Sequence, residues 1–332
     1  MVKKIKFSNY KISVLVNYNC TIFNDSYFLK MYIQRMKKFT FGILVIFIIN
    51  CDHNDRSTLE IEPDENNIYS FQISQIWSQE PEGSRRNVFY KYPVNTNDNI
   101  PVAIILHGNG GNPIDLFNEY NYLINHIIIA PEGYENSWNI GRESSKAPDT
   151  DFINQIINNL NRLENVDEDN ISIIGYSNGS ALVNQLLIEL QSEAFKKAVC
   201  EFCQLNTLQY QDDRFWSRSN IDSDVYDLET SPASNSKILS LAGTNDTTCN
   251  YYGGQGIFDY NFINAEEAAF IWAKVMGYNG DAITNPSQEI ENFNRFSYLD
   301  NKVVHYGLNG LGHGYDESFN ESKSIIKNFL EN

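Results

Sequence analysis

The 332-residue chain is 42% hydrophobic and 13% aromatic, enough for a large buried core, and this composition excludes wholesale disorder. Its formal net charge is −17. Residues 1–50 hold eight of its 25 Lys and Arg residues but only one of its 42 acidic residues, so residues 51–332 carry a net charge of −24. A body this acidic repels phosphate backbones, which excludes nucleic acid as a partner and makes a neutral substrate the expectation.

The N-terminal region has the pattern of an export signal. The basic segment Met36-Lys37-Lys38 precedes an apolar run at 39–49, which is too short to span a bilayer and is followed by Asn50 and Cys51. This order resembles a bacterial lipobox, in which the Cys is lipidated and becomes the mature N-terminus, although Asn50 departs from the usual small residue. The alternative is an N-terminal core helix that ends in Cys.

Four segments follow from this interpretation. We expect an upstream extension at 1–35 that is not normally made, a lipoprotein-type signal peptide at 36–51, a polar tether at 52–65 and one catalytic domain at 66–332. The protein would be exported, as a membrane-anchored lipoprotein (periplasmic or at the cell surface) or as a secreted protein. Its contact with a membrane would be limited to a lipid anchor at Cys51.

The remaining cysteines predict structural use. Cys200, Cys203 and Cys249 stay in the mature chain, and an oxidising compartment allows one disulfide among them. A zinc site needs a second pair of ligands, and no suitably spaced His pair accompanies Cys200-x-x-Cys203. We therefore expect no metal site.

The domain opens with two alternating segments, 68–76 and 87–92, which predict an antiparallel pair around the turn Pro81-Glu82-Gly83-Ser84. Beyond it, apolar strands alternate with segments of helical periodicity. The predicted strands are 102–106, 127–130, 171–174, 198–199, 237–241 and 302–308, and the predicted helices are 151–163, 180–190, 265–276 and 321–330. Strands that are apolar on both faces and separated by helices predict an α/β fold with a mostly parallel central sheet flanked by helices.

A serine turn lies between the third buried strand and its helix. Gly175-Tyr176-Ser177-Asn178-Gly179 is a G-x-S-x-G motif, whose glycines permit a sharp turn that exposes the Ser hydroxyl. The N-terminus of the following helix adds positive potential and free N–H groups for a developing oxyanion. Ser177 is the predicted nucleophile.

A second glycine-rich loop, His107-Gly108-Asn109-Gly110-Gly111, follows the strand at 102–106. This position supplies the other half of an oxyanion hole in the same geometry. We expect the backbone N–H groups of Asn109 and Asn178 to be the donors, with Gly110 as the alternative to Asn109.

A serine nucleophile needs a base and an orienting acid, which follow it in that order along this topology. His313, in a Gly-rich loop after the last strand, is the predicted base, and His305, inside that strand, is the alternative. Asp246, just past the strand 237–241, is the predicted acid. The rival acids lie in one earlier loop: Asp212, Asp213, Asp222 and Asp224.

With these motifs in place, the chain resembles the secreted α/β-hydrolases of the polyhydroxybutyrate depolymerase, feruloyl esterase and acetyl xylan esterase group. The resemblance runs from about Gly83 to Phe329. It is carried by the oxyanion loop 106–112, Pro131-Glu132-Gly133 with Ser137-Trp138-Asn139, the serine turn 175–179, the acid loop 242–246 with 251–254, the helix 265–276 with Trp272, and the histidine loop 310–313. The departures lie at 314–316, where the family often has Trp-Pro, and at 141–145, where it often has a Cys.

The resemblance implies a single α/β-hydrolase domain and a serine carboxylic ester hydrolase that works through an acyl-enzyme without cofactor or metal. It implies small-molecule or polysaccharide ester substrates, such as acetyl or feruloyl esters of polysaccharide or short hydroxyalkanoate esters. Trp138 and Tyr251, with Tyr134 and Tyr252, are candidates to line a substrate pocket or else belong to the core. Two other functions stay open: a serine peptidase of the same fold, and a non-catalytic surface glycan-binding lipoprotein.

Overall fold

The computed structural model describes residues 3–7, 10–14, 63–94, 99–190 and 194–332. The predicted signal peptide, Cys51 and most of the tether lie outside these residues. The chain divides into two compact units, residues 1–55 and 56–332. In the first unit, β1 (Lys3–Phe7) pairs with β2 (Tyr10–Val14) as an antiparallel hairpin. Within the described ranges, no helix is both long and apolar enough to cross a bilayer.

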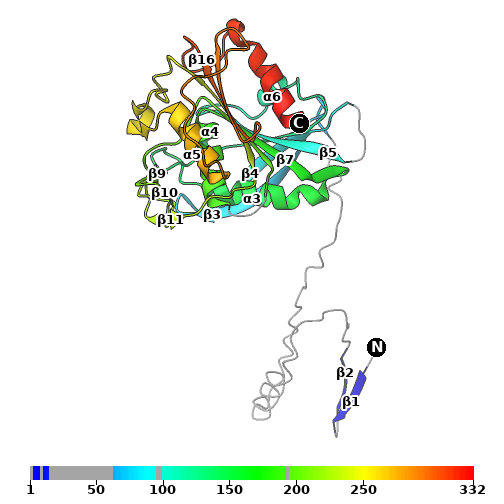
Figure 1. The fold of residues 1–332 in the computed structure, drawn as a ribbon. Coiled ribbons are helices and arrows are strands. Elements are labelled where there is room, and N and C mark those ends of the chain that lie inside the picture. The colour runs from blue at the N-terminus through cyan, green and yellow to red at the C-terminus, as the bar shows by residue number, and fades with distance from the viewer. Residues whose placement is uncertain (1–2, 8–9, 15–62, 95–98, 191–193) are drawn as a thin grey trace. The chain divides into compact units, whose positions relative to one another are not determined.

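A nine-stranded sheet organises the described part of the second unit (Figure 1). From one edge to the other the order is β15, β16, β12, β8, β7, β5, β6, β4, β3, and the strands from β16 to β6 run parallel. The strands are β3 (Tyr69–Trp77), β4 (Glu80–Lys91), β5 (Ile100–Leu106), β6 (Ile127–Pro131), β7 (Val166–Tyr176), β8 (Lys197–Glu201), β12 (Lys237–Gly243), β15 (Phe293–Tyr298) and β16 (Val303–Leu308).

Helices cover both faces of this sheet. The helices are α2 (Leu116–Glu119), α3 (Asp149–Asn159), α4 (Asn178–Glu189), α5 (Ala265–Val275) and α6 (Glu321–Glu331). The first core cluster joins α3, α4 and α5 to one face, and the second joins α2 and α6 to the other. The predicted mostly parallel sheet between helices is therefore confirmed.

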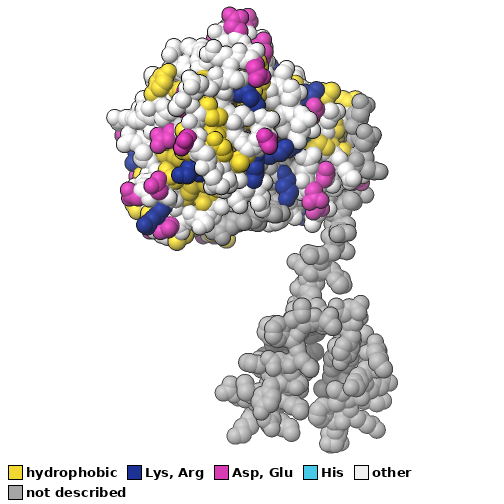
Figure 2. Space-filling model, in the orientation of Figure 1, with side chains coloured by type: hydrophobic (Ala, Val, Ile, Leu, Met, Phe, Trp, Pro, Cys, Tyr) yellow, Lys and Arg dark blue, Asp and Glu magenta, His cyan; other side chains and the backbone are white. Residues whose placement is uncertain are grey.

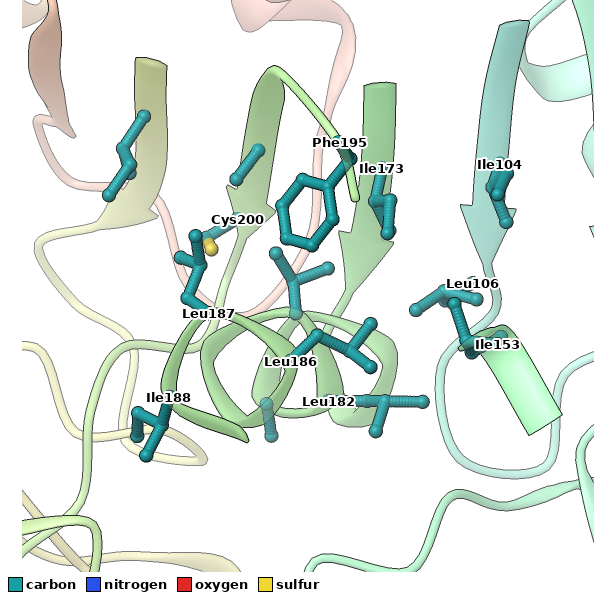
Figure 3. Close-up of a cluster of buried hydrophobic side chains, with 14 of the residues drawn as sticks. Ile104, Leu106, Ile153, Ile173, Leu182, Leu186, Leu187, Ile188, Phe195 and Cys200 are labelled. Carbon is teal, nitrogen blue, oxygen red and sulfur yellow. The ribbon is translucent and has the colours of Figure 1, made fainter. Parts of the chain in front are cut away.

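The central strands are apolar on both faces because both faces are covered. Along β5, alternate side chains enter opposite cores: Ile104 and Leu106 face α3 and α4, whereas Ala103 and Ile105 face α2 and α6. Figure 3 shows the first of these cores, where Leu187 of α4 lies next to Cys200 of β8. Every α4 residue from 178 to 188 is buried, so this helix is held tightly behind the serine turn.

The opening hairpin turns at a different place from the predicted one. The chain reverses at Ser78-Gln79, between Trp77 and Glu80, and the segment 81–84 lies inside β4. Gly83 keeps its place in β4 with a φ of +89°, and a β-bulge between Gln75 and Trp77 adjusts the register. The Pro and Gly of this segment therefore mark an irregular exposed strand and not a turn.

The remaining elements are short or lie at an edge. β15 pairs antiparallel with β16 and was not predicted, because the polar residues of Phe293–Tyr298 hide the strand pattern. The small strands are β9 (Tyr210–Gln211), β10 (Arg214–Ser217), β11 (Leu228–Thr230), β13 (Gly254–Gln255) and β14 (Asn261–Phe262), and the 3-10 turns span Tyr134–Asn136, Leu160–Arg162, Ile257–Asp259 and Glu317–Phe319. On the face shown in Figure 2, acidic side chains are interspersed with Lys and Arg and with exposed hydrophobic side chains.

Candidate active site

Ser177, His313 and Asp246 form a continuous hydrogen-bonded chain at the carboxyl edge of the parallel strands. The Ser177 Oγ lies 2.8 Å from Nε2 of His313, and Nδ1 of His313 lies 2.7 Å from Oδ2 of Asp246. Ser177 follows β7, Asp246 follows β12, and His313 lies in the loop between β16 and α6. Since the carboxyl ends of parallel strands meet at one edge, residues 136 and 67 positions apart come together. The distances are those that nucleophile, base and orienting acid require.

The serine turn is as sharp as its motif predicts. Ser177 has φ 53° and ψ −116°, a strained conformation for a residue with a side chain, and it precedes the first residue of α4. A Cβ on Gly175 would collide with the carbonyl group of Gly179, and a Cβ on Gly179 would collide with the carbonyl oxygen of Leu106 in β5. The two glycines thus let β7, α4 and β5 approach closely enough to fix the hydroxyl.

Asp246 is held in place by its own loop. Its side chain is buried, and Oδ1 accepts the backbone N–H groups of Thr248 and Cys249 at 2.8 and 3.1 Å. The other oxygen, Oδ2, is directed at His313. A carboxylate that is already hydrogen-bonded in this way orients the imidazole without moving itself.

The predicted oxyanion donors lie beside Ser177. Asn178 is the first residue of α4, and it lines a small cavity together with Asn109 and Ser177. The alternative donor, Gly110, already donates its N–H to the carbonyl of Asn136 at 2.7 Å. This bond favours Asn109 over Gly110 as the partner of Asn178.

Buried side chains brace the oxyanion loop. Oδ1 of Asn178 accepts the N–H of Trp138 at 2.7 Å, and Nδ2 donates to the Trp138 carbonyl at 3.1 Å. His107 donates from Nδ1 to the Gly108 carbonyl at 2.7 Å, while Nε2 accepts the N–H of Gly133 at 3.0 Å. Burial lowers the pKa of His107, so the ring stays neutral in the one tautomer that makes both bonds.

Two predicted substrate-binding residues belong to the core instead. Trp138 is 0% exposed, stacks near His107 and donates its indole N–H to the His107 carbonyl. Tyr251 is also 0% exposed, and its hydroxyl meets Glu266 and His305. Both rings thus fill the space behind the loops, and neither lines the cavity that contains Ser177, so their assignment to substrate binding stays a prediction that their burial does not favour.

The remaining two aromatic candidates also lie elsewhere. Tyr134 donates to Glu80 and packs edge-on against Trp77. Tyr252 is exposed and lines a separate surface hollow with Tyr210.

The rival base and acids are placed away from the serine. His305 is buried between the Ser240 hydroxyl and Tyr251, and burial lowers its pKa to about 3, as expected of a core histidine. Three of the four rival acids contact other groups: Asp213 accepts from Tyr210, Asp222 accepts from Ser78, and Asp224 pairs with Arg142. The fourth, Asp212, lines the surface hollow of Tyr210 and Tyr252.

Two cavities flank the oxyanion loop. The one that contains Ser177 is about 30 Å³ and is lined by Ile257, Phe258 and Tyr260 among others. The other is about 490 Å³ and lies between the loop, α2 and α6. Asn109 lines both cavities, whereas Ser177 lines only the smaller one.

Sequence reasoning missed two buried carboxylates beside these cavities. Glu143 accepts from Asn178 Nδ2, from the N–H groups of Ile140 and Gly141, and from the Tyr260 hydroxyl. It lies in the segment 141–145, whose departure from the family pattern was the only indication. Glu201 is the last residue of β8, and nothing in its local sequence indicates a role.

The three cysteines Cys200, Cys203 and Cys249 are buried and unpaired. Among the described residues, no group of three or more His, Cys, Asp or Glu side chains is arranged to hold a metal ion.

No family model and no curated protein sequence matches the chain, whereas many solved structures share its fold. An acetyl xylan esterase from Aspergillus awamori superposes with a TM-score of 0.52 at 16% identity, covering 78% of this chain and 99% of that one. A carboxylesterase from Bacillus cereus superposes with a TM-score of 0.47 at 16% identity, covering 74% of this chain and 93% of that one. Esterase 2 from Thermogutta terrifontis, phosphoramylated by tabun, superposes with a TM-score of 0.49 at 12% identity, covering 79% of this chain and 94% of that one. The superposition on the acetyl xylan esterase, together with the sheet order described above, shows that the chain has the α/β-hydrolase fold.

Proposed function

We propose that the protein is a serine carboxylic ester hydrolase. The observation that carries this proposal is the unbroken chain Ser177–His313–Asp246, set at a strained turn beside two N–H donors. In this chain the Ser177 hydroxyl lies 2.8 Å from one ring nitrogen of His313, and the other ring nitrogen contacts the buried carboxylate of Asp246. A protein that only binds a ligand has no need of this arrangement.

The arrangement supports a two-step reaction. Ser177 Oγ bonds to the ester carbonyl carbon while its proton moves to Nε2 of His313, and the N–H groups of Asn109 and Asn178 hold the oxyanion. His313 then gives the proton to the alcohol oxygen as the carbon–oxygen bond breaks, which leaves an acyl-enzyme. Water repeats the sequence and releases the acid and the free serine.

The space next to Ser177 favours an acetyl group. The cavity that contains Ser177 is small, about 30 Å³, and a short acyl group such as acetyl fits it more readily than a feruloyl or long acyl chain. Acetyl esters, including those on polysaccharide, are thus favoured over feruloyl and hydroxyalkanoate esters within the proposed class.

The decisive experiment is hydrolysis of p-nitrophenyl acetate by the purified chain beside Ser177→Ala. We expect turnover that falls by about 10⁴-fold or more in the variant, as the loss of a serine nucleophile does. We also expect kcat/KM to fall at least tenfold from the acetate to the hexanoate ester. Equal rates in both proteins, with no labelling of Ser177 by a fluorophosphonate, would overturn the proposal and favour the glycan-binding alternative.

A serine peptidase is the second candidate, and the shared fold is the only ground for it. Cleavage of peptide substrates without cleavage of acetyl esters, lost in Ser177→Ala, would select it.

We also infer export as a lipoprotein anchored at Cys51, a proposal supported by the order of basic, apolar and Cys residues at 36–51. Labelling with a radioactive fatty acid in a bacterial host tests it. Incorporation should disappear in Cys51→Ser, and equal labelling of both proteins would contradict it.

A further inference from the structure

Glu143 is a buried carboxylate in the wall of the cavity that contains Ser177, and the two-step reaction gives it no role. It lies in the loop between β6 and α3 and is 4% exposed. Its side chain makes four hydrogen bonds, and every partner is a donor. An ionised carboxylate only accepts hydrogen bonds, so the charged form of Glu143 satisfies all four donors at once.

The two oxygens of Glu143 contact different parts of the molecule. Oε2 accepts the backbone N–H groups of Ile140 and Gly141 at 2.9 and 3.0 Å, and the Tyr260 hydroxyl at 3.1 Å. Oε1 accepts from Nδ2 of Asn178 at 3.3 Å. The first oxygen thus fixes the side chain to its own loop, and the second links this loop to the first residue of α4, whose backbone N–H is the predicted oxyanion donor.

The Asn178 amide can present only its nitrogen to Glu143. Its Oδ1 accepts the N–H of Trp138 at 2.7 Å, and its Nδ2 donates to the Trp138 carbonyl at 3.1 Å. A flipped amide would set N–H against N–H and C=O against C=O at this backbone. The two hydrogens of Nδ2 are therefore divided between the Trp138 carbonyl and Oε1 of Glu143.

The loop that carries Glu143 is itself held in place. The Lys146 ammonium donates to the carbonyls of Gly141 and Glu143 at 2.6 and 2.8 Å, and the Arg142 N–H donates to the Tyr260 hydroxyl at 2.9 Å. Burial raises the pKa of Glu143, while the backbone N–H groups and the Tyr260 hydroxyl that donate to it oppose this shift. The carboxylate is therefore fixed by its own loop independently of Asn178.

We propose that Glu143 is a positioning residue for the oxyanion hole. Its Oε1 holds the Asn178 side chain, so that the Asn178 backbone N–H stays directed at the oxyanion beside Ser177. Glu143 acts through Asn178 and does not touch the reacting atoms. The inference rests on the proposed esterase function, in which an oxyanion donor has to be oriented before charge develops on the substrate.

Glu143→Gln separates this role from the folding of the loop. A carboxamide offers one oxygen and one NH2 group. We expect the oxygen at the Oε2 position, where three donors meet, which leaves the NH2 group facing Nδ2 of Asn178. Two donors then oppose each other, so the Asn178 side chain is displaced while the bonds within the loop remain.

The kinetic test is hydrolysis of p-nitrophenyl acetate by the full chain at pH 8. We expect kcat of Glu143→Gln to fall by about 10- to 100-fold with KM within about threefold of the wild type, because the oxyanion forms only in the transition state. The Ki of ethylboronic acid, which bonds to the Ser177 oxygen as a tetrahedral anion, should rise by the factor by which kcat/KM falls.

Glu189→Gln is the matched control. It makes the same chemical change at the other end of α4, where Glu189 accepts from the side chains of Thr150 and Gln185. We expect its kcat to stay within about twofold of the wild type. Equal kcat values in Glu143→Gln and Glu189→Gln, or a loss confined to KM, would overturn the proposal.

A second variant tests whether Glu143 acts through Asn178. Asn178→Ala removes the amide and keeps the backbone N–H, so it should lower kcat at least as much as Glu143→Gln. Adding Glu143→Gln to Asn178→Ala should then lower kcat by less than about twofold. An unchanged kcat in Asn178→Ala, or a full further loss in the double variant, would contradict the positioning role, and the first of these results decides even where Glu143→Gln does not fold.

The esterase itself is tested without reference to Glu143, by wild-type hydrolysis that is lost in Ser177→Ala. Where this holds, equal kcat values in Glu143→Gln and Glu189→Gln reject only the positioning role. Where the wild type hydrolyses no ester, the rate of fluorophosphonate labelling of Ser177 still depends on the oxyanion hole. Slower labelling in Glu143→Gln than in Glu189→Gln would then support the positioning role although the esterase proposal fails, and equal labelling would reject both.

Discussion

At the scale of single residues, the site depends on groups that are oriented before a substrate arrives. Asp246 uses one oxygen for the backbone of its own loop and the other for His313. Its loop therefore determines which nitrogen of His313 carries the proton, and leaves Nε2 free to accept the proton of Ser177.

Asp246→Asn should lower kcat for p-nitrophenyl acetate by about 10⁴-fold while KM changes little. The amide can donate to Nδ1, which places the proton on Nε2 and removes the base. Steady-state kinetics measure this effect, and Asp281→Asn, at an exposed position, is the control. More than a tenth of the activity in Asp246→Asn would show that Asp246 is not the orienting acid.

Glu201 should make stability depend on pH. Its pKa is about 7 in the folded protein against 4.5 ordinarily, so the folded state binds more protons between these values. The contribution of Glu201 to the free energy of unfolding is therefore fully present below pH 4.5. It is lost as the pH rises through 7, and the total loss is about 3 kcal/mol.

Urea unfolding at pH 5 and pH 8 tests this linkage against Glu201→Gln. The wild-type chain should lose more free energy of unfolding between the two pH values than the variant, which has no charge to bury. Parallel losses in both proteins would mean that Glu201 ionises normally in the fold.

At the scale of elements, the serine turn needs β7, α4 and β5 in close approach. Gly179→Ala should reduce the free energy of unfolding by about 1–3 kcal/mol or more, because its Cβ meets the Leu106 carbonyl in the middle of the sheet. Denaturant unfolding measures the loss. Gly312→Ala is the control, since no atom lies within 4 Å of the added Cβ. Equal stability of both variants would contradict the packing.

A buried ion pair joins β4 to α3. Arg86 and Asp149 meet at 2.7 Å with both side chains shielded, and the Arg86 guanidinium lies 3.7 Å from the centre of the Phe152 ring. Oδ2 of Asp149 also accepts the N–H of Asn139, next to Trp138. The pair thus supports the segment that holds Asn178.

Arg86→Met should destabilise the protein by about 3–5 kcal/mol at pH 8, because it leaves Asp149 charged and unpaired in the core. Burial already raises the pKa of Asp149, so the loss should be smaller at pH 5, where the carboxyl can take up a proton. Urea unfolding provides the measurement, with the exposed neighbour Arg85→Met as control. A loss that does not depend on pH would assign the effect to packing alone.

At the scale of the whole molecule, the net charge of −17 opposes compaction at neutral pH. Raising NaCl from 10 to 300 mM at pH 7 should increase Tm by roughly 2–4 °C through screening, about 1 kcal/mol of relieved repulsion. Calorimetric scans test it. At pH 4.7, near the isoelectric point, the increase in Tm with NaCl should disappear. An equal increase in Tm at that pH would show that the effect has a cause other than charge repulsion.

The sequence could predict whatever is encoded locally. Runs of apolar residues predicted the central strands, which are covered on both faces. The G-x-S-x-G motif predicted Ser177 because the five residues of the motif determine the shape of the turn. His313 and Asp246 could be predicted from chain order, since the parallel sheet brings the ends of their strands together. The opening turn was misplaced because Pro and Gly mark an irregular strand as readily as a turn.

Packing between distant segments decides which side chains surround the site. The sequence predicts Trp138 and Tyr251 as pocket residues because an aromatic next to a motif has the same local sequence whether it faces a cavity or the core. Glu143 and Glu201 went unnoticed because their burial depends on partners such as Tyr260 and Tyr315, far away in the chain. Local patterns and chain order thus sufficed to predict the fold class and the candidate triad, while cavity size, charge and buried acids arose from packing between distant segments, which no local pattern encodes.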